Sequence, residues 1–165
     1  WVNRNNLPAH GIVETQSDAP GAPPELSLYI TEGYYRGPAT RLRRYTLRLD
    51  GFVSVSAPPN GGEFTTKPVL FAKSIQPTGI SINFSTSAVG SLRCELQDQN
   101  SKPIPGYTLD DCDEIYGDRI DRVITWHGKS EVSQLADKPT RLRFVMNDAD
   151  LYALQIRPNV ADATK

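Results

Sequence analysis

The fold of this chain is decided by one stretch, Arg141-Leu-Arg-Phe-Val-Met-Asn-Asp-Ala-Asp-Leu-Tyr-Ala-Leu-Gln-Ile156. Apolar and polar residues alternate through its first half, which is the pattern of a strand that buries one face. Similar short runs fill the sequence from Ser81 onward and are separated by turn residues. No stretch carries a helical period over three turns. The sequence therefore predicts an all-β protein built as an antiparallel β-sandwich.

Ten short strands are expected when the same reading is extended outward, and one short helical turn is expected within residues 132–139. This number of strands favours a jelly-roll-like sandwich over an immunoglobulin-like one. The expected strands cover residues 25–31, 40–49, 52–56, 63–66, 67–72, 79–84, 90–97, 123–126, 140–146 and 151–156.

Three parts are expected along the 165 residues. Residues 1–24 are rich in Asn, Pro, Gly and Ala, which is typical of an extended arm or linker. Residues 25–157 form the sandwich, and residues 158–165 form a C-terminal tail. Within the sandwich, residues 25–31 and 40–49 read as a hairpin with a wide connection.

Composition argues against several classes of function. The 18 basic and 19 acidic residues give a net charge of -1, so no overall field attracts nucleic acid or an anionic membrane. No apolar run approaches the roughly 18 residues that cross a bilayer. His10 and His127 are the only histidines of the sequence. Two histidines far apart in the chain argue against a histidine-based metal centre or a catalytic triad. The sequence thus favours a binding module over an enzyme.

Two cysteines, Cys94 and Cys112, leave two alternatives open. A disulfide between them would close a loop of about 19 residues and stabilise the fold by roughly 3 kcal/mol. Alternatively, both are buried free thiols, since Cys94 lies in mid-strand and Cys112 in a loop.

Aromatic side chains are the first candidates for ligand binding, because a flat ring can cover the apolar face of a sugar. Tyr34 and Tyr35 lie in a loop flanked by glycines, where a buried role for both is hard to build. Tyr107, Tyr116 and Trp126 flank an acidic segment and could form a second platform. Trp126 also ends an apolar strand, so a place in the core is the alternative for it.

Arginines are the second candidates, and Arg36 lies beside the two tyrosines of the loop. Alternation along a strand places Arg41 and Arg43 on one face with Tyr45, and places Arg44 on the other. Guanidinium groups suit the sulfate or uronate groups of an anionic polysaccharide. A solvated face paired with acids, or a seam against a neighbouring domain, is the alternative.

The acidic segment 110–118 predicts a possible structural calcium site, because calcium prefers oxygen ligands. Its spacing matches no EF-hand. Solvated carboxylates and caps that bond to backbone amides are the alternative. The candidate ligands are Asp110, Asp111, Asp113, Glu114 and Asp118.

Several short motifs in fixed order give the chain a resemblance to a bacterial family. It resembles the C-terminal β-sandwich attached to five-bladed propeller proteins related to glycoside hydrolases, over roughly residues 25–157. The motifs are Arg41-Leu-Arg-Arg-Tyr-Thr-Leu-Arg-Leu-Asp-Gly-Phe-Val-Ser-Val55, Gly62-Glu-Phe-Thr-Thr-Lys-Pro68, Ser85-Thr-Ser-Ala-Val-Gly-Ser91, Pro103-Ile-Pro-Gly106, Asp110-Asp-Cys-Asp-Glu114 and Asp148-Ala-Asp-Leu-Tyr152.

The resemblance implies a non-catalytic carbohydrate-binding or accessory module that is secreted or periplasmic and covalently linked to a catalytic domain. Residues 25–49 would then belong to the junction with that propeller. No catalytic residue carries over. The ligand would be a polysaccharide or oligosaccharide, and no binding motif of the family maps onto this sequence. The candidate ligand-binding residues therefore rest on the side-chain chemistry above, and they are Tyr34, Tyr35, Arg36, Tyr116 and Trp126.

Two other functions stay open. The first is a structural sandwich that packs on the propeller without binding glycan. An exposed apolar patch would favour this function, and its residues would be Leu26, Leu28, Ile30 and Tyr45. The second is an independent hydrolase, which would need a cleft with two carboxylates about 5 to 10 Å apart.

Overall fold

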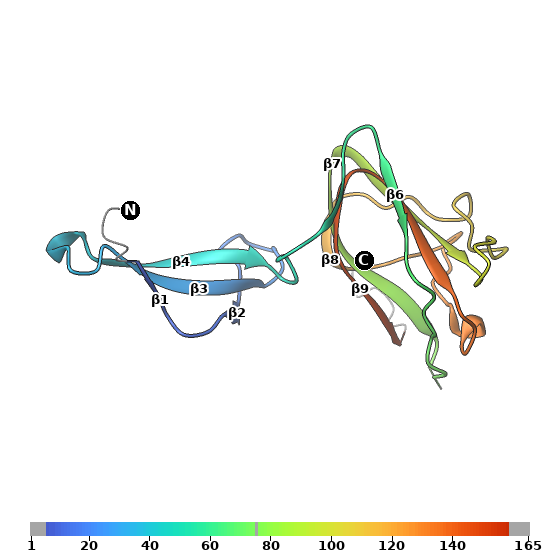
Figure 1. The fold of residues 1–165 in the computed structure, drawn as a ribbon, viewed down its shortest axis with the longest axis horizontal. Coiled ribbons are helices and arrows are strands. Elements are labelled where there is room, and N and C mark those ends of the chain that lie inside the picture. Colours follow the sequence, from blue (N-terminus) through green and yellow to red (C-terminus); the bar gives the residue numbers. More distant parts are fainter. Residues whose placement is uncertain (1–5, 75, 159–165) are drawn as a thin grey trace. The chain divides into compact units, whose positions relative to one another are not determined.

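The computed structural model describes residues 6–74 and 76–158, and it is all-β and antiparallel, as predicted (Figure 1). The chain divides into two compact units, which we call unit 1 (Trp1–Phe52) and unit 2 (Val53–Lys165). The only helical elements of the described residues are two 3-10 turns, η1 (Gly37–Ala39) and η2 (Ser133–Leu135). Of these, η2 lies where the sequence predicted a helical turn. None of the described helical turns is long and apolar enough to cross a membrane.

Unit 1 is a four-stranded antiparallel sheet centred on β3 (Glu25–Glu32). One edge of β3 pairs along its full length with β4 (Arg41–Arg48), which gives the predicted hairpin. The other edge pairs first with β1 (Leu7–Pro8) and then with β2 (Val13–Thr15). Part of the expected arm is therefore strand, because its backbone groups find partners on β3. Residues 1–5 lie outside the described residues, as do residues 159–165 of the expected tail.

The sheet of unit 1 has two faces of different character. Leu26, Leu28 and Ile30 alternate along one face of β3, and the register places Leu47 and Tyr45 of β4 beside them; we call this the apolar face. The opposite face holds Arg44, which donates to Glu25 at 2.5 Å and to Ser27 at 2.8 Å. Among residues 6–52, Ser27 is the only buried one, so unit 1 has a sheet without an apolar core of its own.

Unit 2 is a five-stranded antiparallel sheet in which two strands are unusually long. These are β7 (Thr78–Gln97) and β9 (Arg141–Pro158), which pair along most of their length. Shorter strands complete the sheet, with β5 and β6 on β9 and β8 on β7. They are β5 (Val55–Ala57), β6 (Gly62–Thr65) and β8 (Asp118–Val123).

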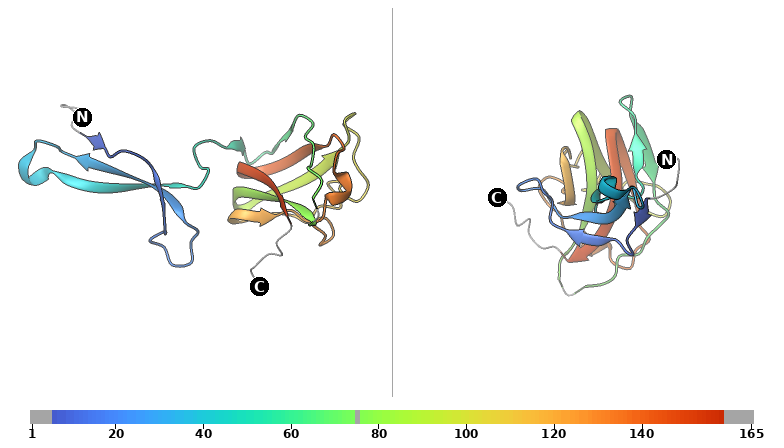
Figure 2. Two further views of the ribbon diagram at one scale, coloured as in Figure 1. Left: turned by 90° about the horizontal axis from the view of Figure 1, so that it is seen from below. Right: turned by 90° about the vertical axis from the view of Figure 1, so that its left-hand side faces the viewer.

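The long strands change register midway and curl over, so that the sheet becomes sandwich-like (Figure 2). The sequence predicted two separate strands, 79–84 and 90–97, where β7 runs through. The register shift falls between Thr86 and Ser91, and a Cβ at Gly90 would lie only 2.3 Å from the carbonyl oxygen of Asp148. A residue without a side chain therefore lets the two backbones approach at the bend.

The core of unit 2 fills the inside of the curled sheet. Trp126 is 1% exposed, and its indole Nε1 donates to the carbonyl oxygen of Cys94 at 2.9 Å. Phe64 and Phe144 stack with their ring centroids 5.2 Å apart. The largest fully buried side chains are Phe71, Ile80, Ile82, Phe84, Leu92, Leu96, Ile115, Ile124, Trp126, Leu142, Phe144 and Met146. Trp126 thus takes the core position that the sequence left as its alternative.

Two of the buried residues are free thiols, Cys94 and Cys112, the second alternative for the cysteine pair. The amide of Cys94 donates to Cys112 Sγ at 3.3 Å, which links the middle of β7 to the acidic segment. Burial raises the pKa of both thiols, so they stay protonated at neutral pH.

The expected strand 67–72 forms only isolated bridges, from Val69 to Thr140 and from Phe71 to Ala136. Its side chains still contribute to the core through Phe71, which is 1% exposed. Val69 also packs against the core, and backbone hydrogen bonds join Val69 to Thr140 in both directions, so the segment is held without a continuous ladder.

Candidate functional site

The connection between β3 and β4 displays two adjacent tyrosines at the tip of the unit 1 hairpin. The ring centroids of Tyr34 and Tyr35 are 4.1 Å apart, with their planes inclined by 51°. Tyr34 is 39% exposed and Tyr35 is 87% exposed. The structure therefore brings together two of the residues that the sequence predicted as ligand-binding, with both rings accessible.

Local backbone geometry explains this display. Gly33 has a φ of 65°, and a Cβ there would lie 2.8 Å from the carbonyl oxygen of Ala39. The carbonyl of Gly33 accepts from the amide of Arg36 at 2.9 Å, which closes the turn. Tyr35 also has a positive φ, 67°, which costs a non-glycine residue free energy. The turn thus holds a strained, exposed aromatic residue at its tip.

An open groove of about 690 Å³ is lined by residues on both sides of the tyrosines in the chain, although neither tyrosine lines it. Its charged end is organised by Glu32, which accepts from Arg41 Nε at 2.6 Å and from the hydroxyl of Tyr45. The hydrogen bond from Tyr45, followed by that from Arg41, lowers the pKa of Glu32. The lining residues are Asn6, Glu32, Gly33, Arg36, Pro38, Ala39 and Arg41.

Arg36 differs from the other cations of this groove in its ion pairing. Arg41 and Arg43 both pair with Glu32, at 2.6 Å and 3.4 Å. Arg36 forms no ion pair with any residue that the structure describes. Its guanidinium therefore remains available to a ligand anion in the groove, and it directly follows Tyr35 in the turn.

The other predicted aromatic residues lie in unit 2 and have different environments. Tyr116 is 74% exposed in the loop before β8. Trp126 is buried and packs edge-on against Tyr107, with ring centroids 5.1 Å apart. A sugar needs an open ring face, and the burial of Trp126 leaves none. The second platform predicted from Tyr107, Tyr116 and Trp126 is thus reduced to one exposed ring.

Two of the predicted calcium ligands are engaged within the protein. Asp111 accepts from the amide and the hydroxyl of Thr108, at 3.0 Å and 2.8 Å, and its other oxygen lies 2.9 Å from His127 Nε2. Asp113 accepts from the Thr125 hydroxyl at 2.6 Å and the Gly128 amide at 2.8 Å. These carboxylates fasten the acidic segment to the turn at residues 126–129.

The remaining predicted ligands do not join these two. Glu114 lies 3.8 Å from Arg93, Asp110 and Asp118 are exposed, and the described residues contain no cluster of three or more side chains suited to a metal. The capping role that the sequence left as an alternative accounts for Asp111 and Asp113.

These caps predict a dependence of stability on pH. Hydrogen bonds from Thr108 lower the pKa of Asp111, and those from Thr125 and Gly128 lower the pKa of Asp113. A carboxylate whose pKa is lower in the folded state contributes stability above its unfolded pKa of about 4, and this contribution is lost as the pH falls through the folded pKa. We therefore expect the melting temperature to fall on acidification below about pH 4.

The double variant Asp111→Asn with Asp113→Asn should melt lower at neutral pH and lose less on acidification. Asp110→Asn is the matched control, because Asp110 is exposed in the same segment. Thermal melts from pH 7 to pH 2 measure the difference. Equal slopes for the double variant and the wild type would contradict a capping role for the two carboxylates.

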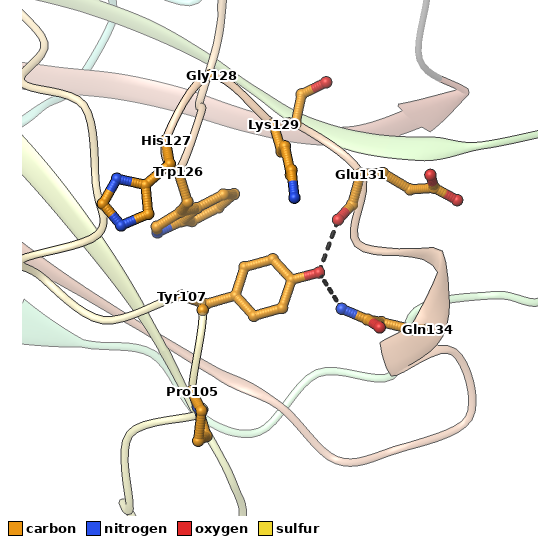
Figure 3. A pocket seen from close by; sticks show the side chains of 10 residues that line it. Pro105, Tyr107, Trp126, His127, Gly128, Lys129, Glu131 and Gln134 are labelled. Carbon is orange, nitrogen blue, oxygen red and sulfur yellow. Dashed lines mark hydrogen bonds between the residues drawn. The ribbon is translucent and has the colours of Figure 1, made fainter.

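A further pocket, of about 630 Å³, opens in unit 2 beside the turn at residues 126–129 (Figure 3). The hydroxyl of Tyr107 donates to the carbonyl oxygen of Glu131 at 2.7 Å and accepts from Gln134 Nε2 at 2.6 Å. The lining residues are Pro105, Gly106, Tyr107, Trp126, His127, Gly128, Lys129, Ser130, Glu131 and Gln134. The sequence pointed to Tyr107 and Trp126 as candidate aromatic residues and gave no sign of Lys129 or Gln134.

Comparisons with known proteins identify no relative: no family model, curated protein or solved structure matches the chain.

Proposed function

We propose that the chain is a non-catalytic accessory module that binds a polysaccharide or oligosaccharide at the hairpin tip of unit 1. The observation that carries the proposal is the pair of accessible rings of Tyr34 and Tyr35, 4.1 Å apart. Exposed aromatic pairs of this kind suit the apolar faces of sugar rings. Tyr35 has a positive φ while its side chain is 87% exposed, and a conformational cost at such an exposed residue supports a role in binding.

Arg36 indicates which class of glycan would bind at this site. Arg36 lines the groove of unit 1, directly follows Tyr35 in the chain, and has no acidic partner among the described residues. Two parallel N–H donors match the oxygens of a uronate or a sulfate. We therefore propose an anionic polysaccharide, with the rings stacking on the sugar and Arg36 binding its charged group. A shallow open site of this kind binds in the micromolar to millimolar range, which is about -8 to -4 kcal/mol.

The test is affinity electrophoresis of the chain in gels that contain neutral, uronate-bearing or sulfated polysaccharides. Retardation by an anionic polymer is expected for the wild type and should be lost in Tyr34→Ala with Tyr35→Ala, because both stacking surfaces are gone. Stacking on an aromatic ring contributes about 0.5–1.5 kcal/mol, so losing two rings weakens binding by about fivefold to 150-fold. Tyr116→Ala is the control, since it removes an exposed tyrosine ring from unit 2.

Retardation that persists in the double tyrosine variant would overturn the hairpin-tip site. The variant Arg36→Gln tests the contribution of charge separately from that of ring stacking, because it removes the guanidinium and keeps both tyrosines. It should weaken binding to the anionic polymers and leave any binding to neutral polymers unchanged. Melting curves of each variant show whether a lost interaction reflects lost folding.

A second candidate function is favoured by one specific observation. Leu26, Leu28, Ile30 and Tyr45 share the apolar face of unit 1, and no buried apolar core lies beneath it in residues 6–52. Such a face suits docking against the covalently linked catalytic domain that the family resemblance implies, without glycan binding. A folded chain that no polysaccharide retards would favour this candidate over the first.

A further inference from the structure

The pocket beside Tyr107 in unit 2 takes no part in the proposed hairpin-tip site. Its volume of about 630 Å³ lies within the range of about 300–1,000 Å³ that is usual for small-molecule sites. Its walls come from three segments, around Pro105, around the turn at 126–129 and around Gln134. The chemical groups of these walls that are not engaged within the protein determine which ligand the pocket can bind.

Several polar groups of the pocket are already satisfied within the protein. The Tyr107 hydroxyl uses its donor and one acceptor position on Glu131 and Gln134, and the Trp126 indole N–H is bound to Cys94. The turn is closed by mutual backbone hydrogen bonds between Trp126 and Lys129, at 2.8 Å and 3.0 Å. The walls are therefore fixed before any ligand arrives, which lowers the entropy cost of binding.

Two side chains of the lining offer a ligand one donor and one acceptor. Lys129 forms no ion pair with a described residue, and Figure 3 shows its ammonium group directed into the space above Tyr107. The amide of Gln134 is oriented by the bond from its Nε2 to Tyr107, which leaves its Oε1 as a fixed acceptor. The carboxylate of Glu131 points away from Tyr107 in the same view.

We propose that this pocket binds a single sugar residue, with Lys129 donating to its oxygens and Gln134 Oε1 accepting from a hydroxyl. A hydroxyl is both a donor and an acceptor, so a polyol satisfies both groups at once. A simple anion would leave Gln134 Oε1 without a donor, and His127 is already paired with Asp111. Pro105 and the accessible edges of Tyr107 and Trp126 supply the apolar part of the wall. The ligand class rests on the proposed carbohydrate function, whereas the residues are those of a separate site.

The test is a titration of the ¹⁵N-labelled chain with glucose, galactose, mannose and glucuronic acid, followed by amide chemical shifts. At least one sugar is expected to shift the amides of Gly106 and Gly128, with a dissociation constant in the millimolar range. Lys129→Ala with Gln134→Ala should weaken this binding about tenfold, because both polar contacts are lost. Lys138→Ala is the matched control, as it removes an exposed lysine outside the pocket.

The position of the shifted amides separates this proposal from the hairpin-tip site. Shifts at Gly106 and Gly128 that weaken in the double variant support the pocket, whether or not Gly33 and Gly37 of the hairpin respond. Shifts confined to Gly33 and Gly37 overturn the pocket and leave the hairpin-tip site standing. No shift at Gly106 or Gly128 with any of the four sugars, or binding unchanged by the double variant, overturns the pocket as well.

Discussion

Replacing Trp126 by alanine lowers the free energy of unfolding of unit 2 by about 3–5 kcal/mol, which is the usual cost of deleting a buried large aromatic side chain. Trp126 is 1% exposed and packs against Tyr107. Its removal also leaves the buried carbonyl oxygen of Cys94 without the indole donor at 2.9 Å. An unsatisfied buried acceptor adds to the cost of the cavity.

Urea unfolding followed by far-ultraviolet circular dichroism measures this loss. Tyr116→Ala is the control, because Tyr116 is an aromatic residue of the same unit that is 74% exposed, and its loss should change stability by less than about 0.5 kcal/mol. If both variants unfold at the same urea concentration as the wild type, Trp126 is not part of the core.

Replacing Gly90 by alanine is the second change with a large expected effect. The added Cβ would lie 2.3 Å from the carbonyl oxygen of Asp148 and 2.8 Å from that of Asn147. Both are backbone atoms of β9, so the contact can be relieved only by moving the two long strands apart at their bend. We expect a loss of about 3 kcal/mol, the upper part of the range for overpacked sites.

Gly62→Ala provides a matched control in the same sheet. Its Cβ would meet the Cβ of Ala57 at 3.6 Å, an ordinary van der Waals contact. Denaturant unfolding should place this variant within about 1 kcal/mol of the wild type. A Gly90→Ala variant as stable as Gly62→Ala would show that the bend at Gly90 can open without cost.

The features that the sequence predicted correctly are those that depend on residues close together in the chain. The hairpin of residues 25–31 and 40–49 is present as β3 and β4. Arg41, Arg43 and Tyr45 share a face, as their common contact with Glu32 shows. Alternation along a strand determines both features. The accessible rings of Tyr34 and Tyr35 follow equally from a loop rich in glycine.

What the sequence could not show depends on partners far away along the chain. Part of the expected arm forms the strands β1 and β2 because both pair with β3. The sequence of residues 1–24 does not indicate that β3 is their partner. The pocket of unit 2 joins Tyr107 to Gln134, which are 27 positions apart. The hydrogen bonds from Thr108, Thr125 and Gly128 to Asp111 and Asp113 depend on how the loops fold, so the sequence alone left calcium binding and capping as alternatives.

The outer edge of β4 has a consequence for how the protein avoids aggregation. Among the described strands, β4 pairs with β3 alone, so its second edge presents unpaired backbone groups to which another chain could add a strand. Long charged side chains occupy half of the positions of β4, at Arg41, Arg43, Arg44 and Arg48. Charged side chains on an edge strand disfavour the addition of a strand from another chain, so they protect a sheet that has little buried core.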